Sequence, residues 1–142
     1  MTKEKILDTA PVFRTYFPMY KFMNFILCFT QKRIIFYFME YFPYKFGFPS
    51  EYENKIVKKE EELKNYDGDI NDLIKNRENS FDIPYEDITK IWFFSYYRIF
   101  LKLNKNYKNR RVTISYIINN QTLVKNLFKK YCTSVFSKKK KS

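Results

Sequence analysis

The best-spaced group of oxygen ligands in this sequence is formed by Asp67, Asp69, Asn71 and Glu78. They occupy positions 1, 3, 5 and 12 of a twelve-residue calcium loop, in which carboxylate and amide oxygens coordinate the metal. Position 6 of such a loop needs glycine for its sharp turn, but this chain has Asp72 there. We therefore predict helix capping by Asp67 and Asp69 and no metal site, with calcium as the weaker alternative.

The sequence lacks the side chains that most hydrolases and nucleotide-dependent enzymes use. It contains no histidine, which removes Ser-His-Asp and Cys-His pairs, an imidazole base and His-containing zinc sites. Its two glycines, Gly47 and Gly68, cannot form a glycine-rich phosphate loop. The acidic run Glu60–Glu62 is interpreted as a hydrated helix face. We therefore predict that the protein is not an enzyme and takes no cofactor.

The cysteines and the apolar stretches indicate a cytoplasmic protein. Cys28 and Cys132 lie in apolar surroundings and form no Cys-x-x-Cys pair, so buried free thiols are expected, with a disulfide as the alternative. Residues Met1–Ala10 are too charged for a secretory signal. The longest apolar stretches, Phe22–Phe29 and Ile34–Met39, are well below the ~20 residues of a membrane-spanning helix.

The charge is divided unevenly along the chain. Residues 88–142 contain 14 Lys and Arg and no Asp or Glu, whereas residues 1–87 contain 13 basic and 15 acidic side chains. The net charge of +12 is thus about −2 followed by +14. Codons rich in A and T explain a high lysine total, but they do not explain why acidic residues stop at Asp87. The uniform sign of the second part indicates an anionic partner.

Three stretches near the N-terminus predict consecutive strands over Val12–Phe17, Phe22–Thr30 and Arg33–Tyr41. The second and third stretches carry apolar residues on both faces, whereas a strand with one wet face would alternate. We therefore expect these strands to be central in the sheet, or covered by another element.

The C-terminal part alternates more regularly. Strand character resumes over Phe81–Phe94. Next, residues 98–103 and 111–116 predict a hairpin with a polar loop at Lys105–Asn109, in which aliphatic residues form the core face. The basic side chains expected on its solvent face are Arg98, Lys102 and Arg111.

Helices are predicted over Glu51–Tyr66, over about Ile70–Arg77, and after Asn120 as N-cap. The first is highly charged with a narrow apolar stripe that includes Ile56 and Leu63. We expect it to dock on the sheet, with binding to another chain as the alternative. The last has a broad apolar face suited to cover a sheet or close the end of a barrel.

Two segments resemble motifs of GRAM-like and prokaryotic pleckstrin-homology-like (PH-like) domains. Residues Phe29–Phe36, FTQKRIIF, resemble their T-x-x-R-[ILV]-[ILV] turn and strand. Residues Ile83–Ile91, IPYEDITKI, resemble their I-P-Y-x-D-I-x-x-I strand. The predicted order of elements is strands, an insertion, further strands and one C-terminal amphipathic helix. This order resembles that of domains in the same superfamily.

This resemblance implies an α+β fold, namely a PH-like bent antiparallel β-barrel or sandwich capped by a C-terminal amphipathic helix. It covers the chain except for about residues 43–80, which would be a helical insertion between two strands. Residues 1–136 would then form a single PH-like domain, and residues 137–142 a disordered basic tail. Thr30 and Arg33 would bracket a hairpin turn.

The resemblance does not supply a lipid site. Phosphoinositide-binding members of the superfamily carry several Lys and Arg around the loop between the first two strands. Here that loop, near Pro18–Lys21, offers Lys21 with Arg14 nearby. The ligand must therefore be argued from this chain's own charges, because a shared fold does not imply a shared function.

The predicted function is a non-enzymatic PH-like interaction or adaptor domain. Its basic C-terminal half would bind an anionic phospholipid surface or a protein partner, and no small-molecule substrate is expected. Polybasic contacts contribute about 1 kcal/mol per Lys or Arg at such a surface, which would hold the protein at the inner membrane face. The alternative is a nucleic-acid-binding protein that uses the same face. The predicted anion-binding residues are Arg98, Lys102, Lys105, Lys108, Arg110, Arg111, Lys138, Lys139, Lys140 and Lys141.

Base stacking would require aromatic side chains among these cations on one exposed face. Tyr96, Tyr97 and Phe100 lie in the right stretch of sequence. Because the stretch is so apolar, we expect these three rings to pack in the core.

Overall fold

The computed structural model describes residues 3–16, 21–42, 50–94, 98–108, 110–116, 120–133 and 135. They form an α+β fold, as predicted, with a seven-stranded antiparallel sheet and three α-helices, one of them C-terminal. The strands are β1 (Asp8–Tyr16), β2 (Lys21–Phe29), β3 (Arg33–Phe42), β4 (Phe81–Pro84), β5 (Ile88–Phe94), β6 (Arg98–Leu103) and β7 (Arg111–Tyr116).

The sheet curls so that its two edges approach each other at one end. The strand order is β4-β3-β2-β1-β7-β6-β5, which makes β4 and β5 the edge strands. The 3₁₀ turn Tyr85–Asp87 nevertheless links β4 directly to β5. Because such a link spans at most about 14 Å, the sheet must bend back on itself. A short pairing between β1 and β7, at Val12 and Phe13, joins the two halves.

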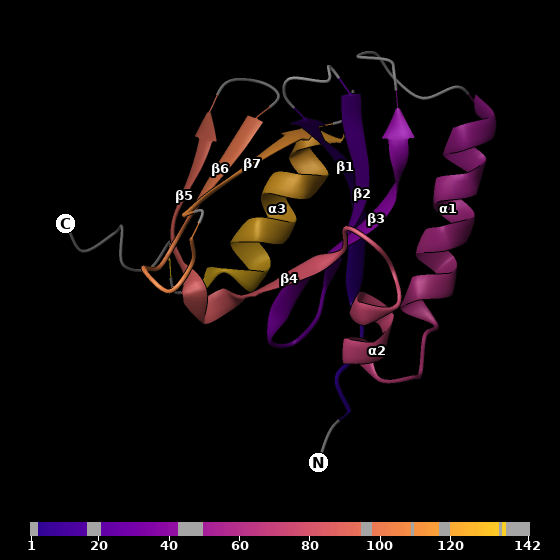
Figure 1. The fold of residues 1–142 in the computed structure, drawn as a ribbon, viewed down its shortest axis with the longest axis horizontal. Helices are drawn as coiled ribbons and strands as arrows, with labels where there is room; N and C mark the ends of the chain where they lie inside the picture. Colours follow the sequence, from indigo (N-terminus) through magenta and orange to yellow (C-terminus); the bar gives the residue numbers. More distant parts are fainter. Residues whose placement is uncertain are drawn as a thin grey trace.

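The larger core lies on the inner face of the curled sheet. Helix α3 (Gln121–Tyr131) lies between the strands β1–β3 and the strands β5–β7 (Figure 1). Its buried residues Val124, Leu127 and Phe128 belong to one cluster with core residues from both halves of the sheet. The Phe128 ring meets the Phe29 ring edge-on, with 5.6 Å between centroids. The predicted role of this helix as a cover for the sheet is therefore confirmed.

A second core covers the opposite face of β2 and β3. Helices α1 (Ser50–Lys64) and α2 (Ile70–Lys75) follow β3 in the chain, and α1 lies on the side of the β1–β3 strands away from α3 (Figure 1). Ile56 and Leu63 of α1 and Ile70 of α2 are buried there against residues such as Ile35. This cover explains why β2 and β3 are apolar on both faces, and it confirms that the first helix docks on the sheet.

The structure corrects two local predictions. The expected strand over residues 81–94 is two strands at opposite edges of the sheet, divided by the 3₁₀ turn after Pro84. Asn120 stands at the N-cap of α3 but makes no side-chain cap hydrogen bond, because its Nδ2 donates to the Pro11 carbonyl of β1 at 2.7 Å. Capping by Asp69 is confirmed, since its Oδ1 accepts from the Asn71 N–H at 2.7 Å.

Candidate anion-binding face

Three predicted anion-binding residues project from one surface of the β5–β7 half of the sheet. Arg98 and Lys102 belong to β6, and Arg111 is the first residue of β7. The alternate residues of β6, Ile99, Leu101 and Leu103, are buried. Alternation along the strands therefore places these cations on the solvent side, as the sequence predicted.

Lys102 is the centre of a row of three cations. In the strand register it pairs with Lys90 of β5 on one side and with Arg111 of β7 on the other. Neighbouring strands lie about 4.8 Å apart, so these side chains are adjacent on the surface. The row is therefore a compact group of three positive charges.

Trp92 and Phe100 form the next row, beside the row of cations. They are direct partners across β5 and β6, and Phe100 pairs in turn with Thr113 of β7. Trp92 is 41% exposed, and the Nζ atom of Lys90 lies 5.7 Å from the centroid of its ring. Phe100 is half-buried and lies on the same solvent side as Arg98. The expectation that Phe100 packs in the core is wrong, because strand alternation directs it outward.

These outward-facing residues of β5–β7 are called the cationic face from here on. Figure 1 shows β5–β7 at the side of the molecule away from α1. The members of the cationic face are Lys90, Trp92, Arg98, Phe100, Lys102, Arg111 and Thr113.

Sequence reasoning missed Lys90 and Trp92 because β5 changes its alternation at Thr89. The register with β6 shifts between Ile88 and Lys90, which leaves Thr89 as the extra residue of a β-bulge. As a result Thr89 and Lys90 are both exposed, while Ile88 and Ile91 are both buried. The spacing of Ile88 and Ile91 was the available signal for this bulge. Residues three apart in a regular strand point to opposite faces, so two isoleucines at this spacing can both face the core only if the strand is irregular.

The cations of this face have no acidic neighbour in their own strands. Residues 88–142 contain neither Asp nor Glu, and like charges directly opposite each other destabilise an antiparallel sheet. Lys102 takes part in two such pairs. A bound anion would relieve this repulsion.

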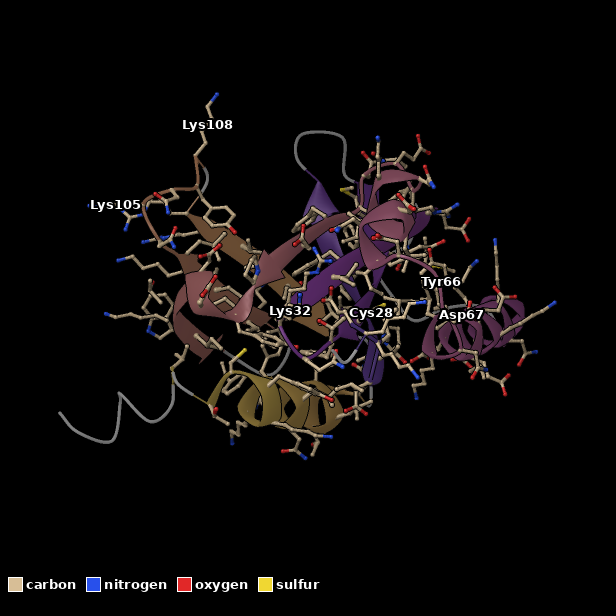
Figure 2. The ribbon with its side chains drawn as sticks, turned by 90° about the horizontal axis from the view of Figure 1, so that it is seen from below. Cys28, Lys32, Tyr66, Asp67, Lys105 and Lys108 are labelled. Atoms are coloured by element: carbon tan, nitrogen blue, oxygen red, sulfur yellow. The ribbon has the colours of Figure 1, made fainter. Side chains whose placement is uncertain are left out.

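Asp87 holds the loop between β6 and β7, which carries two further predicted residues. Asn104 Nδ2 and the Tyr107 hydroxyl donate to its two carboxylate oxygens at 3.0 and 2.6 Å. Burial and the hydrogen bond to this carboxylate raise the pKa of Tyr107, so the phenol stays protonated. The last acidic side chain of the chain, Asp87, is therefore partly buried and engaged in hydrogen bonds with this loop. Figure 2 shows Lys105 and Lys108 pointing outward at this end of the molecule.

Arg110 extends the same hairpin beyond the two strands. Its carbonyl accepts from the Leu103 N–H at 2.7 Å, and its exposed side chain lies at the junction of the loop and β7. Arg110 lies opposite Leu103, whose side chain faces the core, and its Nε donates to the Leu103 carbonyl at 3.5 Å, so strand alternation does not place it in the row of cations. The remaining predicted residues, Lys138–Lys141, and the aromatic residues Tyr96 and Tyr97 lie outside the described residues.

The lysines of α3 divide between two surroundings. The Nζ atoms of Lys125 and Lys129 each lie 5.7 Å from the centroid of the Phe93 ring in β5, so they extend the positive charge around this edge strand. Lys130 instead pairs with Asp8 of β1 at 2.9 Å. Asp8 therefore neutralises the charge of Lys130, away from the β5–β7 surface.

A second polar cluster surrounds the turn between β2 and β3. The Arg33 guanidinium donates to both carboxylate oxygens of Glu4, at 2.9 and 2.8 Å, and to Asp82 at 3.1 Å. Thr30 Oγ1 accepts from the Arg33 N–H at 3.1 Å, which confirms that Thr30 and Arg33 bracket the turn. An open hollow of about 580 Å³ adjoins the cluster. Because these polar groups bind one another, the cluster stabilises the turn and offers less to a ligand than the cationic face.

The two thiols are placed in the core. Cys28 and Cys132 are buried and unpaired, as predicted. Burial raises the pKa of Cys132 to about 12, and burial together with the nearby Glu60 raises the pKa of Cys28. Both thiols are therefore protonated at neutral pH and unsuited to act as nucleophiles.

Comparisons with protein-family models, curated proteins and solved structures find no match to this chain. Among the described residues, no helix is both long and apolar enough to cross a bilayer. The same residues contain no group of three or more acidic or thiol side chains arranged to hold a metal ion. The function must therefore be inferred from the geometry of the cationic face itself.

Proposed function

We propose that this chain is a non-enzymatic interaction domain of the PH-like type. The arrangement of its elements supports this: β1–β4 and β5–β7 form two antiparallel meanders joined through β1 and β7, and a C-terminal helix packs between them. Of the two PH-like segments, FTQKRIIF spans the β2–β3 turn and IPYEDITKI spans the β4–β5 link. The first segment forms a turn and strand as the resemblance implies, whereas the second, expected as one strand, is divided by the 3₁₀ turn.

The proposed partner is a polyanion that binds the cationic face. The observation that carries this proposal is the row formed by Lys90, Lys102 and Arg111, three adjacent cations without a carboxylate in the same strands. Elsewhere on this chain, basic side chains such as Arg33 and Lys130 are paired with acids. The row therefore keeps its positive charge available for a partner.

The strength of such binding should depend steeply on salt. Each exposed pair of opposite charges contributes roughly 0–1 kcal/mol in water, so affinity requires several contacts at once. The screening length falls from about 30 Å at 0.01 M salt to about 8 Å at 0.15 M, which weakens all of these contacts together.

Retention of the full chain on a sulfated polysaccharide resin tests the proposal. The double variant Lys102→Glu, Arg111→Glu should elute at much lower salt than the wild-type protein. The control is Lys58→Glu, Lys75→Glu, which changes the net charge equally at exposed positions of α1 and α2. Equal loss of retention in both variants, or no retention of the wild-type protein at low salt, would overturn the proposal.

A further inference from the structure

We infer that the polyanion is single-stranded nucleic acid, whose bases stack on Trp92 and Phe100. This inference rests on the proposed function and specifies its partner. It follows from where these two rings lie within the cationic face.

Trp92 and Phe100 provide two aromatic side chains next to each other on a rigid support. As direct partners across antiparallel strands, they have Cβ atoms about 4.5–5.5 Å apart. Trp92 is 41% exposed although it lies within a strand. Stacking of a base on an aromatic side chain contributes about 1–3 kcal/mol and tolerates any base, because every base has a flat π face.

Cations lie on both sides of the two rings, where a phosphate backbone would run. On one side is the row of cations centred on Lys102, about 6.7 Å away along the strands. On the other side is Arg98, two residues before Phe100 in β6. Thr113 completes the row of the rings and offers a hydroxyl that can donate or accept a hydrogen bond at a base edge. Aromatic rings between the row of cations and Arg98 match a single strand whose bases lie on the rings, while successive phosphates of its one backbone contact the cations before and after them.

The same arrangement favours a single strand over a duplex. In a double helix the flat faces of the bases are covered by neighbouring base pairs, so Trp92 and Phe100 could not stack on them. A duplex would contact the cations alone, through its phosphates.

A membrane surface fits this geometry less well. To insert its ring among lipid chains, Trp92 would have to enter the apolar layer from the flat face of a sheet. Lys90, whose ammonium group lies over that ring, and Lys102 in the adjacent row would enter with it. Moving charges into the apolar layer costs several kcal/mol, which opposes insertion from this face.

The fluorescence of Trp92 tests the inference directly, because Trp92 is the chain's single tryptophan. The full chain is titrated with an oligothymidylate of about 12 nucleotides, with a duplex of the same length, with inorganic polyphosphate, and with vesicles of phosphatidylserine and phosphatidylcholine. Stacking should quench the emission with the oligothymidylate and much less with the duplex or polyphosphate.

Two variants separate stacking from charge, with affinities read from the anisotropy of a labelled oligothymidylate. Trp92→Ala should weaken binding about 5- to 150-fold, whereas Trp92→Phe, which keeps a ring, should retain most of it. Neither variant should change the affinity for polyphosphate. Because Trp92 is partly exposed, both variants should fold, which thermal melting checks.

The outcomes distinguish this inference from the proposed function. If Trp92→Ala binds the oligothymidylate as tightly as the wild-type protein, stacking is overturned while polyanion binding stands. If vesicles bind and shift the emission but the oligothymidylate does not, the partner is an anionic membrane and the inference is overturned. If none of the probes binds at low salt, the proposed function fails as well.

Discussion

Lys102 pairs directly with Arg111 across β6 and β7, on the solvent side of the sheet. Its partner on the other side, Lys90 of β5, is also a cation. A lysine held between two cations raises the free energy of the folded state, because like charges opposite each other in a sheet repel. The same repulsion leaves the row ready for an anion, so stability and binding should change in opposite directions here.

Lys102→Glu should therefore stabilise the protein while it weakens polyanion binding. The substitution turns two repulsive cross-strand pairs into two attractive ones, which should raise the free energy of unfolding by about 1 kcal/mol. Urea unfolding measures this change, and salt elution from the sulfated resin measures the loss of binding. The stability of Lys102→Gln should lie between that of the wild-type protein and that of Lys102→Glu. A Lys102→Glu protein less stable than the wild type would contradict the assigned repulsion.

Sequence predictions were correct where strand alternation alone determines which side chains face the core and which face solvent. In β6 and β7, alternation with a period of two separates core from solvent, so the sequence alone places Arg98, Lys102 and Arg111 on the solvent side. For β2 and β3, apolar residues on both faces predicted either a central position in the sheet or a cover by another element, and the structure shows a cover. Docking of the first helix was predicted from its narrow apolar stripe, but the strands on which α1 and α2 dock could not be predicted, because they depend on tertiary packing.

The rings of the cationic face escaped prediction for two physical reasons. The bulge at Thr89 reverses the alternation of β5, so a regular strand read from Ile88 would direct Trp92 inward. Phe100 was assigned to the core by its apolar side chain, although it shares a strand face with Arg98 and Lys102. Strand alternation is the better guide there, because it is imposed by the backbone.

Acid should destabilise the protein through Glu4. Burial raises the pKa of Glu4, but hydrogen bonds from Arg33 and Thr30 outweigh burial and hold the pKa below its ordinary value of 4.5. The unfolded chain therefore takes up this proton at a higher pH than the folded protein does. The contribution of Glu4 is complete above pH 4.5 and is lost as the pH falls through the folded pKa.

Glu4→Gln should flatten the acid limb of a plot of unfolding free energy against pH. At pH 7 it should also cost about 1–3 kcal/mol, because the Arg33 guanidinium loses a charged partner. Urea unfolding at a series of pH values measures both effects. Glu53→Gln, at an exposed position of α1, is the control and should leave the curve unchanged. An unaltered acid limb in Glu4→Gln would contradict the assignment.

Phe128 should be the main anchor of α3. Its ring is fully buried against Phe29, so Phe128→Ala should lower the free energy of unfolding by about 3–5 kcal/mol. Phe128→Leu should lose less, since it fills more of the space. Leu123 lies on the same helix but is 48% exposed, so Leu123→Ala should change stability by less than about 0.5 kcal/mol. Comparable losses at both positions in chemical unfolding would contradict the burial of this helix face.

The two thiols should react only when the protein opens. Cys28 and Cys132 are buried, and the pKa of Cys132 is about 12, so little thiolate exists at pH 8. Labelling with a thiol-reactive disulfide reagent should be slow in native buffer and immediate for both groups in denaturant. Rapid reaction of one thiol in the native protein would show that its surroundings open readily, and Cys28→Ser would identify which thiol it is.

The charge around Trp92 should be visible in how small ions quench its fluorescence. Because Lys90 and the row of cations attract anions, iodide should quench the emission more than caesium does, relative to their effects on free tryptophan amide. The difference should shrink as salt rises to about 1 M, where the screening length is about 3 Å. Lys90→Gln with Lys102→Gln should reduce the iodide preference, whereas Lys58→Gln, on α1, should not. An iodide-to-caesium ratio equal to that of free tryptophan amide at low salt would mean that the potential at this face is not positive, and the proposed binding of a polyanion would then lose its physical basis.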